Sequence, residues 1–159
     1  MIVKYMDCEY KYISNRRYRY IITSQKEKAK DGFAFKNGIY WKAVEEKDLT
    51  DIYAVKFWVK YKSGFKGVSD WWILSNEKNV IKNNKVKLVF AEGVLPNWEI
   101  IDKNVCSALI PLSEIIETKV VICYKKRDGV VLDKKIYEER IISTKELKDM
   151  LFHYNVNSL

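Results

Sequence analysis

The chain has 159 residues, 48% of them hydrophobic and 31% charged, which is enough for one domain with a substantial core and argues against disorder. Its net charge of +8 makes phosphate groups and acidic protein surfaces the natural targets. The three cysteines lie far apart and form no CxxC pair, which excludes a zinc ribbon and a thioredoxin-type motif. We therefore expect a single globular domain over residues 1–159 with reduced thiols.

The N-terminal segment MIVKYMDCEYKY carries charges at positions 4, 7, 9 and 11 and lacks the apolar centre of a signal peptide. No apolar run approaches the roughly 18 residues needed to span a bilayer. These features predict a cytoplasmic protein without a membrane partner.

The first third of the chain is predicted to form hairpins. Residues 2–13 alternate imperfectly and predict one strand, which turns at residues 14–16 and returns over residues 17–23. Residues 24–31 are polar on all sides and predict a loop with no more than one helical turn. In residues 32–44 the pair Asn37-Gly38 predicts a type I′ turn, because both residues tolerate positive φ.

The strongest pattern is the strict alternation that begins at Tyr53. One face of this predicted strand holds five apolar or aromatic residues, namely Tyr53, Val55, Phe57, Val59 and Tyr61. The other face holds Lys56, Trp58 and Lys60. Such a pattern predicts a half-buried central strand. Gly64 and Gly67 predict a turn after it, and residues 68–74 are expected to return as its partner.

The second half predicts another strand at residues 86–92, a short helix at residues 112–117, and a hairpin that turns at Asp128-Gly129. In the segment before the short helix, Pro96 interrupts any strand. Ser143 and Glu146 have the spacing of a capping box. An amphipathic C-terminal helix is expected after them, with four apolar or aromatic residues on one face, namely Leu147, Met150, Leu151 and Tyr154.

Together these elements predict an α+β fold dominated by antiparallel hairpins. We expect a twisted sheet of seven to nine strands and one to three short helices, including the C-terminal one. The pattern leaves open whether the sheet stays open or closes into a barrel.

The principal candidate binding surface is the hairpin around residues 10–20. Residues 1–30 carry eight basic and three acidic groups, so they hold +5 of the net charge. Three arginines are interleaved here with tyrosines, in the set Arg16, Arg17, Tyr18, Arg19 and Tyr20. Arginine pairs with carboxylates or phosphates, and tyrosine stacks on bases or side chains. The alternative is a solvated edge hairpin whose arginines prevent edge-to-edge pairing.

Two further sets of residues are candidates for binding. Lys56 and Lys60 flank Trp58 on the solvent face of the central strand, where a simple solvated face has the same pattern. In the pair Trp71-Trp72, strand geometry turns one indole inward and the other outward, and an outward Trp is a candidate interface anchor.

Catalytic signatures are absent from the sequence. The single histidine, His153, is expected on the surface of the last helix, off its apolar stripe. No glycine-rich phosphate loop occurs, and no acidic cluster has the spacing of a nuclease metal site. We therefore expect no enzyme, no catalytic residue, no metal and no cofactor.

Two functions remain in contention. The first is a non-enzymatic protein-binding inhibitor or antagonist of phage or mobile-element origin, directed at a host nucleic-acid-processing or defence complex such as a restriction or CRISPR nuclease. The second is a nucleic-acid-binding module that uses the basic hairpin. The partner is thus a host protein or nucleoprotein complex, or nucleic acid directly. Carboxylates interleaved among the basic residues favour the first.

Overall fold

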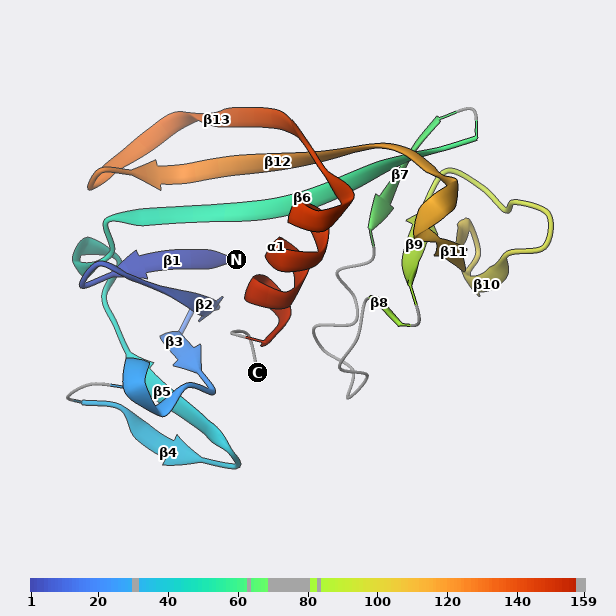
Figure 1. Ribbon diagram of the computed structural model, residues 1–159. Helices are drawn as coiled ribbons and strands as arrows, with labels where there is room; N and C mark the ends of the chain where they lie inside the picture. The colour runs from blue at the N-terminus through green and yellow to red at the C-terminus, as the bar shows by residue number, and fades with distance from the viewer. Residues whose placement is uncertain (30–31, 63, 69–80, 83, 157–159) are drawn as a thin grey trace. The chain divides into compact units, whose positions relative to one another are not determined.

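The computed structural model describes residues 1–29, 32–62, 64–68, 81–82 and 84–156 (Figure 1). These residues form thirteen β-strands, one α-helix and short 3-10 turns, and the strand pairs whose register is described below are antiparallel. The predicted α+β class with a large antiparallel sheet is therefore confirmed. The predicted number of seven to nine strands is too low.

The chain divides into two compact units. Unit 1 comprises Met1–Val55, Ile122–Glu138 and Phe152–Leu159. Unit 2 comprises Lys56–Val121 and Glu139–Leu151.

Unit 1 is built from successive hairpins. Its strands follow the order β6-β1-β2-β3-β5-β4. They are β1 (Ile2–Tyr5), β2 (Cys8–Ser14), β3 (Arg19–Thr23), β4 (Ala34–Lys36), β5 (Ile39–Ala43) and the first part of β6 (Asp51–Tyr61). Two 3-10 turns belong to the same unit: η1 (Lys26–Lys28) after β3 and η2 (Glu46–Asp48) before β6. Parts of β12 (Ile115–Arg127) and β13 (Val130–Ile142) complete it.

The predicted single strand over residues 2–13 is in fact two strands. A two-residue turn at Met6-Asp7 separates β1 from β2, with Tyr5 opposite Cys8. Both turn residues have positive φ, 47° at Met6 and 61° at Asp7. The sequence does not predict this turn, because methionine rarely adopts a positive φ.

Both predicted two-residue hairpins are confirmed. Asn37 and Gly38 have φ values of 54° and 79°, and Lys36 lies opposite Ile39. Asp128 and Gly129 have φ values of 49° and 81° and connect β12 to β13. Positive φ at both central residues defines the type I′ turn.

The core of unit 1 is a cluster of buried side chains from its strands and from the segment before β6. Its members are Val3, Tyr10, Tyr12, Ile21, Leu49 and Ile52. Val3 lies opposite both Tyr10 and Ile52, so three neighbouring strands contribute to one packed layer.

Strand β6 carries the predicted buried stripe with one exception. Tyr53, Phe57, Val59 and Tyr61 are all buried, whereas Val55 is only half-buried. On the other face Lys56 is exposed and Lys60 is half-buried. The alternation therefore assigns the inward face correctly along most of the strand.

The partner of β6 begins earlier than predicted. Strand β7 (Gly64–Val68) pairs with β6 in a register that places Tyr61 opposite Gly64. Gly64 and Gly67 are thus strand residues and not turn residues. The rest of the predicted return strand, residues 69–74, lies outside the described residues.

Unit 2 continues from β6 through β7 to β9 (Lys85–Phe90), β11 (Val105–Pro111) and β10 (Glu99–Asp102). The two-residue strand β8 (Ile81–Lys82) pairs with β9. The expected helix at residues 112–117 is wrong, because only the 3-10 turn η4 (Leu112–Glu114) precedes β12. Leu112 is buried, whereas Ile116 is 66% exposed.

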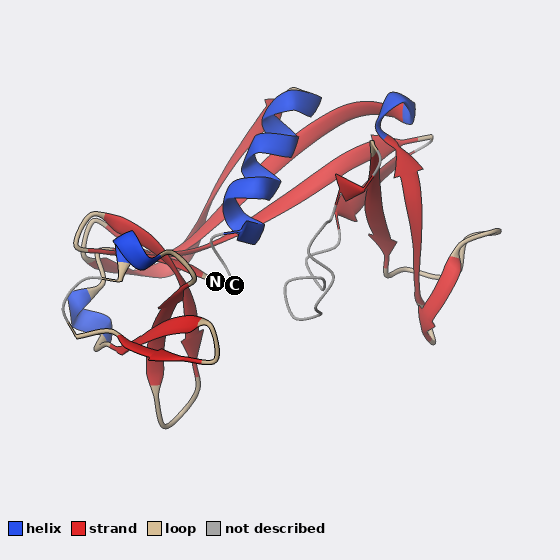
Figure 2. Ribbon diagram, turned by 60° about the horizontal axis from the view of Figure 1, so that its bottom comes forward, coloured by secondary structure: helices blue, strands red, loops and turns tan. Residues whose placement is uncertain are grey.

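The predicted C-terminal helix is confirmed as α1 (Thr144–Val156), drawn as the long blue coil in Figure 2. Its capping box is formed: the amide of Glu146 donates to Ser143 Oγ at 3.1 Å, and the amide of Ser143 donates to Glu146 Oε2 at 2.8 Å. Leu147 and Leu151 are buried and Met150 is half-buried. The side chain of Tyr154 lies outside the described residues.

Candidate binding surface on the arginine–tyrosine hairpin

The β2–β3 loop is organised by one asparagine. The side-chain Oδ1 of Asn15 accepts the amide of Arg17 at 2.8 Å and the amide of Tyr18 at 2.9 Å. Its own amide donates to the carbonyl of Tyr18 at 3.0 Å. Asparagine is suited to this position because its short side chain replaces missing main-chain partners in a turn. The turn therefore covers residues 15–18, so it ends two residues later than predicted, and β3 begins at Arg19.

The three arginines of this hairpin have different surroundings. All three are exposed. Arg19 Nε lies 3.5 Å from Glu46 Oε2, so its charge is partly satisfied within the chain. No ion pair of Arg16 or Arg17 occurs with any described residue. The two arginines at the loop are therefore the ones that can pair with a partner.

An aromatic row begins at the same loop and crosses onto β5. The rings of Tyr18 and Tyr20 have centroids 5.4 Å apart, and those of Tyr20 and Trp41 are 6.1 Å apart in an edge-to-face arrangement. Strand register explains this contact, since Tyr20 lies opposite Ala43 and Trp41 is its diagonal neighbour. Tyr18 is 45% exposed, while Tyr20 and Trp41 are half-buried.

Trp41 was not among the residues selected from sequence. Its place beside Tyr20 depends on the pairing of β3 with β5, two strands separated by the polar segment and β4. A hydrophobic pattern along one strand carries no information about which other strand lies next to it. The local signal, a Trp beside Tyr40 in the hairpin predicted around Asn37-Gly38, identifies a strand but not a binding surface.

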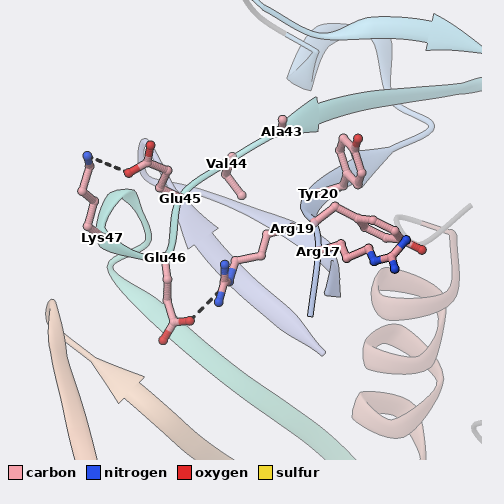
Figure 3. Close-up of a pocket in the computed structure, with 9 residues that line it drawn as sticks. Arg17, Arg19, Tyr20, Ala43, Val44, Glu45, Glu46 and Lys47 are labelled. Atoms are coloured by element: carbon pink, nitrogen blue, oxygen red, sulfur yellow. Dashed lines mark ion pairs between the residues drawn. The ribbon is translucent and has the colours of Figure 1, made fainter. Parts of the chain in front are cut away.

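A shallow depression of about 550 Å³ lies between the end of the hairpin and the segment that precedes β6 (Figure 3). Its lining consists of Arg17, Tyr18, Arg19, Tyr20, Ala43, Val44, Glu45, Glu46 and Lys47. Figure 3 shows the guanidinium of Arg19 turned toward Glu46, with that of Arg17 on the side away from this carboxylate. The depression is therefore bounded by acidic residues on one side and by Arg17 on the other.

The acidic side of the depression is held in place by local contacts. Lys47 Nζ lies 2.6 Å from Glu45 Oε2, and the hydrogen bond from Lys47 holds the pKa of Glu45 below its ordinary value. Glu45 also caps η2 reciprocally with Asp48. Lys126 also contacts η2, because its ammonium donates to the main-chain carbonyl of Glu46 at 2.7 Å. These contacts fix the segment that presents Glu46 to Arg19.

Burial shifts the pKa values of two neighbouring residues of β2, Lys11 and Tyr12. Desolvation raises the pKa of Tyr12; Arg19 opposes this shift and Glu46 adds to it. Desolvation also lowers the pKa of Lys11, which disfavours its charged form.

The other candidate residues either belong to unit 2 or lie outside the described residues. Lys56, Trp58 and Lys60 belong to unit 2, where Trp58 is half-buried and lies opposite Gly67 on β7. Trp71 and Trp72 lie outside the described residues, as does the side chain of His153. Unit 1 alone holds the hairpin set of Arg16, Arg17, Tyr18, Arg19 and Tyr20.

In the part of the chain that the structure describes, no three His, Cys, Asp or Glu side chains come close enough to hold a metal ion. The described helices are also too short or too polar to cross a membrane. Comparison with known proteins gives no match to a family model, to a curated protein or to a solved structure.

Proposed function

We propose that this chain is a non-enzymatic protein-binding protein whose partner contacts the arginine–tyrosine hairpin of unit 1. In this proposal it acts as an inhibitor or antagonist encoded by a phage or mobile element and directed at a host nucleic-acid-processing or defence complex. A sequence rich in Lys, Ile, Asn and Tyr supports such an origin, because these residues are typical of proteins from AT-rich bacterial and phage genomes.

The observation that carries the proposal is the mixed charge of the depression beside the hairpin. Two of its cations, Arg19 and Lys47, are already paired with Glu46 and Glu45. A nucleic-acid groove needs positive charge that is free to neutralise successive phosphates, and two fixed carboxylates oppose this. A protein surface with charges of both signs can match such a depression and gain specificity from it.

Arg16 and Arg17 supply the charge that is available to a partner. A guanidinium presents donors in a planar fork that fits one carboxylate with two hydrogen bonds. Their position at a loop fixed by Asn15 reduces the conformational entropy that binding would cost. Acidic side chains of the partner are therefore the expected counterparts.

Charge alone does not account for tight binding. An exposed ion pair contributes about 0–1 kcal/mol, whereas a nanomolar complex requires about −12 kcal/mol. The aromatic row of Tyr18, Tyr20 and Trp41 supplies the apolar contact area that is also needed, since Tyr and Trp are the residues enriched at interface hot spots. In this proposal the row anchors the partner and the loop arginines orient it.

Affinity capture from a bacterial lysate, with and without nuclease treatment, tests this proposal. The matched control is the R16S/R17S/Y18A variant, whose changes all lie on exposed side chains. We expect a discrete protein that is retained after nuclease treatment by the wild-type chain and lost by the variant. Capture that disappears with nuclease would instead indicate nucleic-acid binding, and equal capture by both chains would exclude the hairpin as the binding surface.

A further inference from the structure

The strand register of unit 2 places the lysines and the tryptophan of β6 beside an aromatic residue of β7. Trp58 lies opposite Gly67, and Lys60 lies opposite Phe65. Directly opposed residues of an antiparallel pair project from the same face of the sheet, as do residues two apart on one strand. Lys56, Trp58, Lys60 and Phe65 therefore share one face, which we call the lysine–tryptophan face. The buried stripe of β6 projects from the opposite face.

Two aromatic rings lie next to each other on the lysine–tryptophan face. Because Gly67 has no side chain, no side chain of β7 stands directly opposite the indole of Trp58. A Cβ built at Gly67 would lie 3.9 Å from Trp58 Cζ3, so the indole reaches over the glycine. Phe65 is the diagonal neighbour of Trp58, and both rings are only half-buried. Neighbouring rings with accessible surface suit the stacking of unpaired bases, because every base has a π-face.

The strands that form this face carry lysines and no carboxylate. Neither β7, nor β9, nor the part of β6 in unit 2 contains an Asp or Glu residue. Lys56 and Lys60 precede and follow Trp58 by two positions. Lys56 is exposed and Lys60 is half-buried, and neither forms an ion pair with a described residue. Two positive charges thus flank the indole without an internal counter-charge.

The carboxylates near this face come from neighbouring strands, and two of them are already engaged. Glu139 Oε1 lies 3.0 Å from the ammonium of Lys119, which itself lies 4.6 Å from the centroid of the Phe65 ring. Glu99 Oε2 lies 3.6 Å from the ammonium of Lys87. The depression in unit 1 differs, because there the carboxylates are part of the lining. The lysine–tryptophan face is therefore the better match for phosphate groups.

We propose that the lysine–tryptophan face binds single-stranded nucleic acid. Trp58 and Phe65 stack on unpaired bases, and Lys56 and Lys60 contact the phosphates on either side of them. The two lysines are four residues apart on one strand, about 13 Å, with the indole between them. A lysine ammonium binds phosphate as a point charge on a flexible stem, so it follows a backbone without requiring one base sequence. This site lies in unit 2 and is independent of the protein-binding hairpin of unit 1.

Fluorescence anisotropy of a labelled oligo(dT) of about 16 nucleotides tests the role of the lysines. We expect a micromolar dissociation constant at about 50 mM salt. The K56S/K60S variant should bind more weakly, and its log–log salt dependence should be less steep by about 1.4, because each phosphate contact to a single strand contributes about 0.7. K125S/K134S is the matched control, with the same change of charge on exposed strand residues of unit 1. Equal loss in both variants would show attraction to net charge only and overturn the proposal.

Substitutions of Trp58 test the stacking. W58L keeps an apolar side chain at this half-buried position but removes the π-face, so binding should weaken by about tenfold with an unchanged salt slope. W58F keeps a ring and should stay closer to wild type, and Y137A on β13 should have no effect. Circular dichroism establishes that each variant is folded. Equal weakening by W58L and W58F would contradict stacking, and K56S/K60S decides the proposal independently of both.

Competition with other polyanions tests the class of ligand. Unlabelled oligo(dT) should displace the probe more effectively than a duplex of the same length, whose paired bases offer no free π-face, and more effectively than poly-L-glutamate, which has charge but no bases. Equal displacement by the duplex or by polyglutamate would overturn the assignment to single strands. A wild-type chain that does not bind the probe at about 100 μM protein and about 50 mM salt would also overturn it.

Discussion

The ammonium of Lys126 on β12 donates to the main-chain carbonyl of Glu46 at 2.7 Å, and the Lys126 residue is only 4% exposed. Few lysines are buried so completely, because removing the charge from water costs free energy unless hydrogen bonds compensate. The contact joins β12 to the turn η2, which in turn presents Glu46 to Arg19. A buried cation within unit 1 thus supports the acidic side of the candidate binding surface.

Replacing Lys126 by Met should lower the free energy of unfolding by about 1–3 kcal/mol, because the carbonyl of Glu46 loses its charged donor. Lys125, the exposed neighbour on the same strand, provides the control, and its replacement by Met should change stability by less than about 0.5 kcal/mol. Urea denaturation measures both. Equal effects of the two substitutions would mean that Lys126 contributes no more than a surface lysine.

Substitutions in the turn at Met6-Asp7 should increase the stability of the chain. Both residues have positive φ, which Asn and Gly adopt with less strain. The double variant M6N/D7G is expected to raise the free energy of unfolding by about 1 kcal/mol. The converse exchange, N37M/G38D, should lower it at the equivalent turn between β4 and β5. Thermal unfolding measures both variants. Unfolding midpoints that shift in the same direction for the two variants would contradict this account.

The cap of α1 gives stability a defined dependence on pH. The amide of Ser143 and the guanidinium of Arg140 both lower the pKa of Glu146 below its ordinary value of 4.5. A carboxyl group whose pKa is lower in the folded state stabilises the fold above the unfolded pKa, and this contribution is lost as the pH falls through the folded pKa. The stability difference between wild type and E146Q should therefore be largest near neutral pH and shrink below about pH 4.5. A difference that stayed constant from pH 7 to pH 3 would contradict the proposed role of the carboxylate.

Local signals in the sequence predict a large part of this fold. Asn37-Gly38 and Asp128-Gly129 identify two turns because their residue types are matched to positive φ. Ser143 and Glu146 identify the start of α1, and alternation along β6 assigns its buried face. Each of these features depends on residues that are neighbours in the chain.

The features that sequence reasoning missed depend on contacts between distant segments or on unusual backbone choices. Met6 adopts a conformation that methionine rarely takes, so the first strand was predicted as continuous. The ion pair of Arg19 with Glu46 and the edge-to-face contact of Tyr20 with Trp41 are set by how β3 pairs and where η2 lies. Counting charges along the sequence treats the three arginines as equivalent, whereas in the structure Arg19 is paired with Glu46 of the same chain.

The aromatic row should control how long a partner remains bound. Removing the ring of Tyr18, with the Y18A substitution, deletes an exposed contact next to Tyr20 without opening the core. We expect faster dissociation of the captured partner, with little change in its association rate. Tyr137, an exposed tyrosine on β13 in the same unit, serves as the matched control, and Y137A should leave both rates unchanged. Equal acceleration by Y18A and Y137A would remove the reason to place the anchor at the hairpin.

Association kinetics of the captured partner with wild type and with the R16S/R17S variant, measured over a range of salt concentrations, test the central claim most directly. Exposed charges at an interface steer the encounter, so their loss slows association and flattens its dependence on salt. The account predicts that the variant associates about tenfold more slowly at low salt, and that the two rates converge as salt rises. An unchanged rate with an unchanged salt response would show that the hairpin is a solvated edge and not a binding surface.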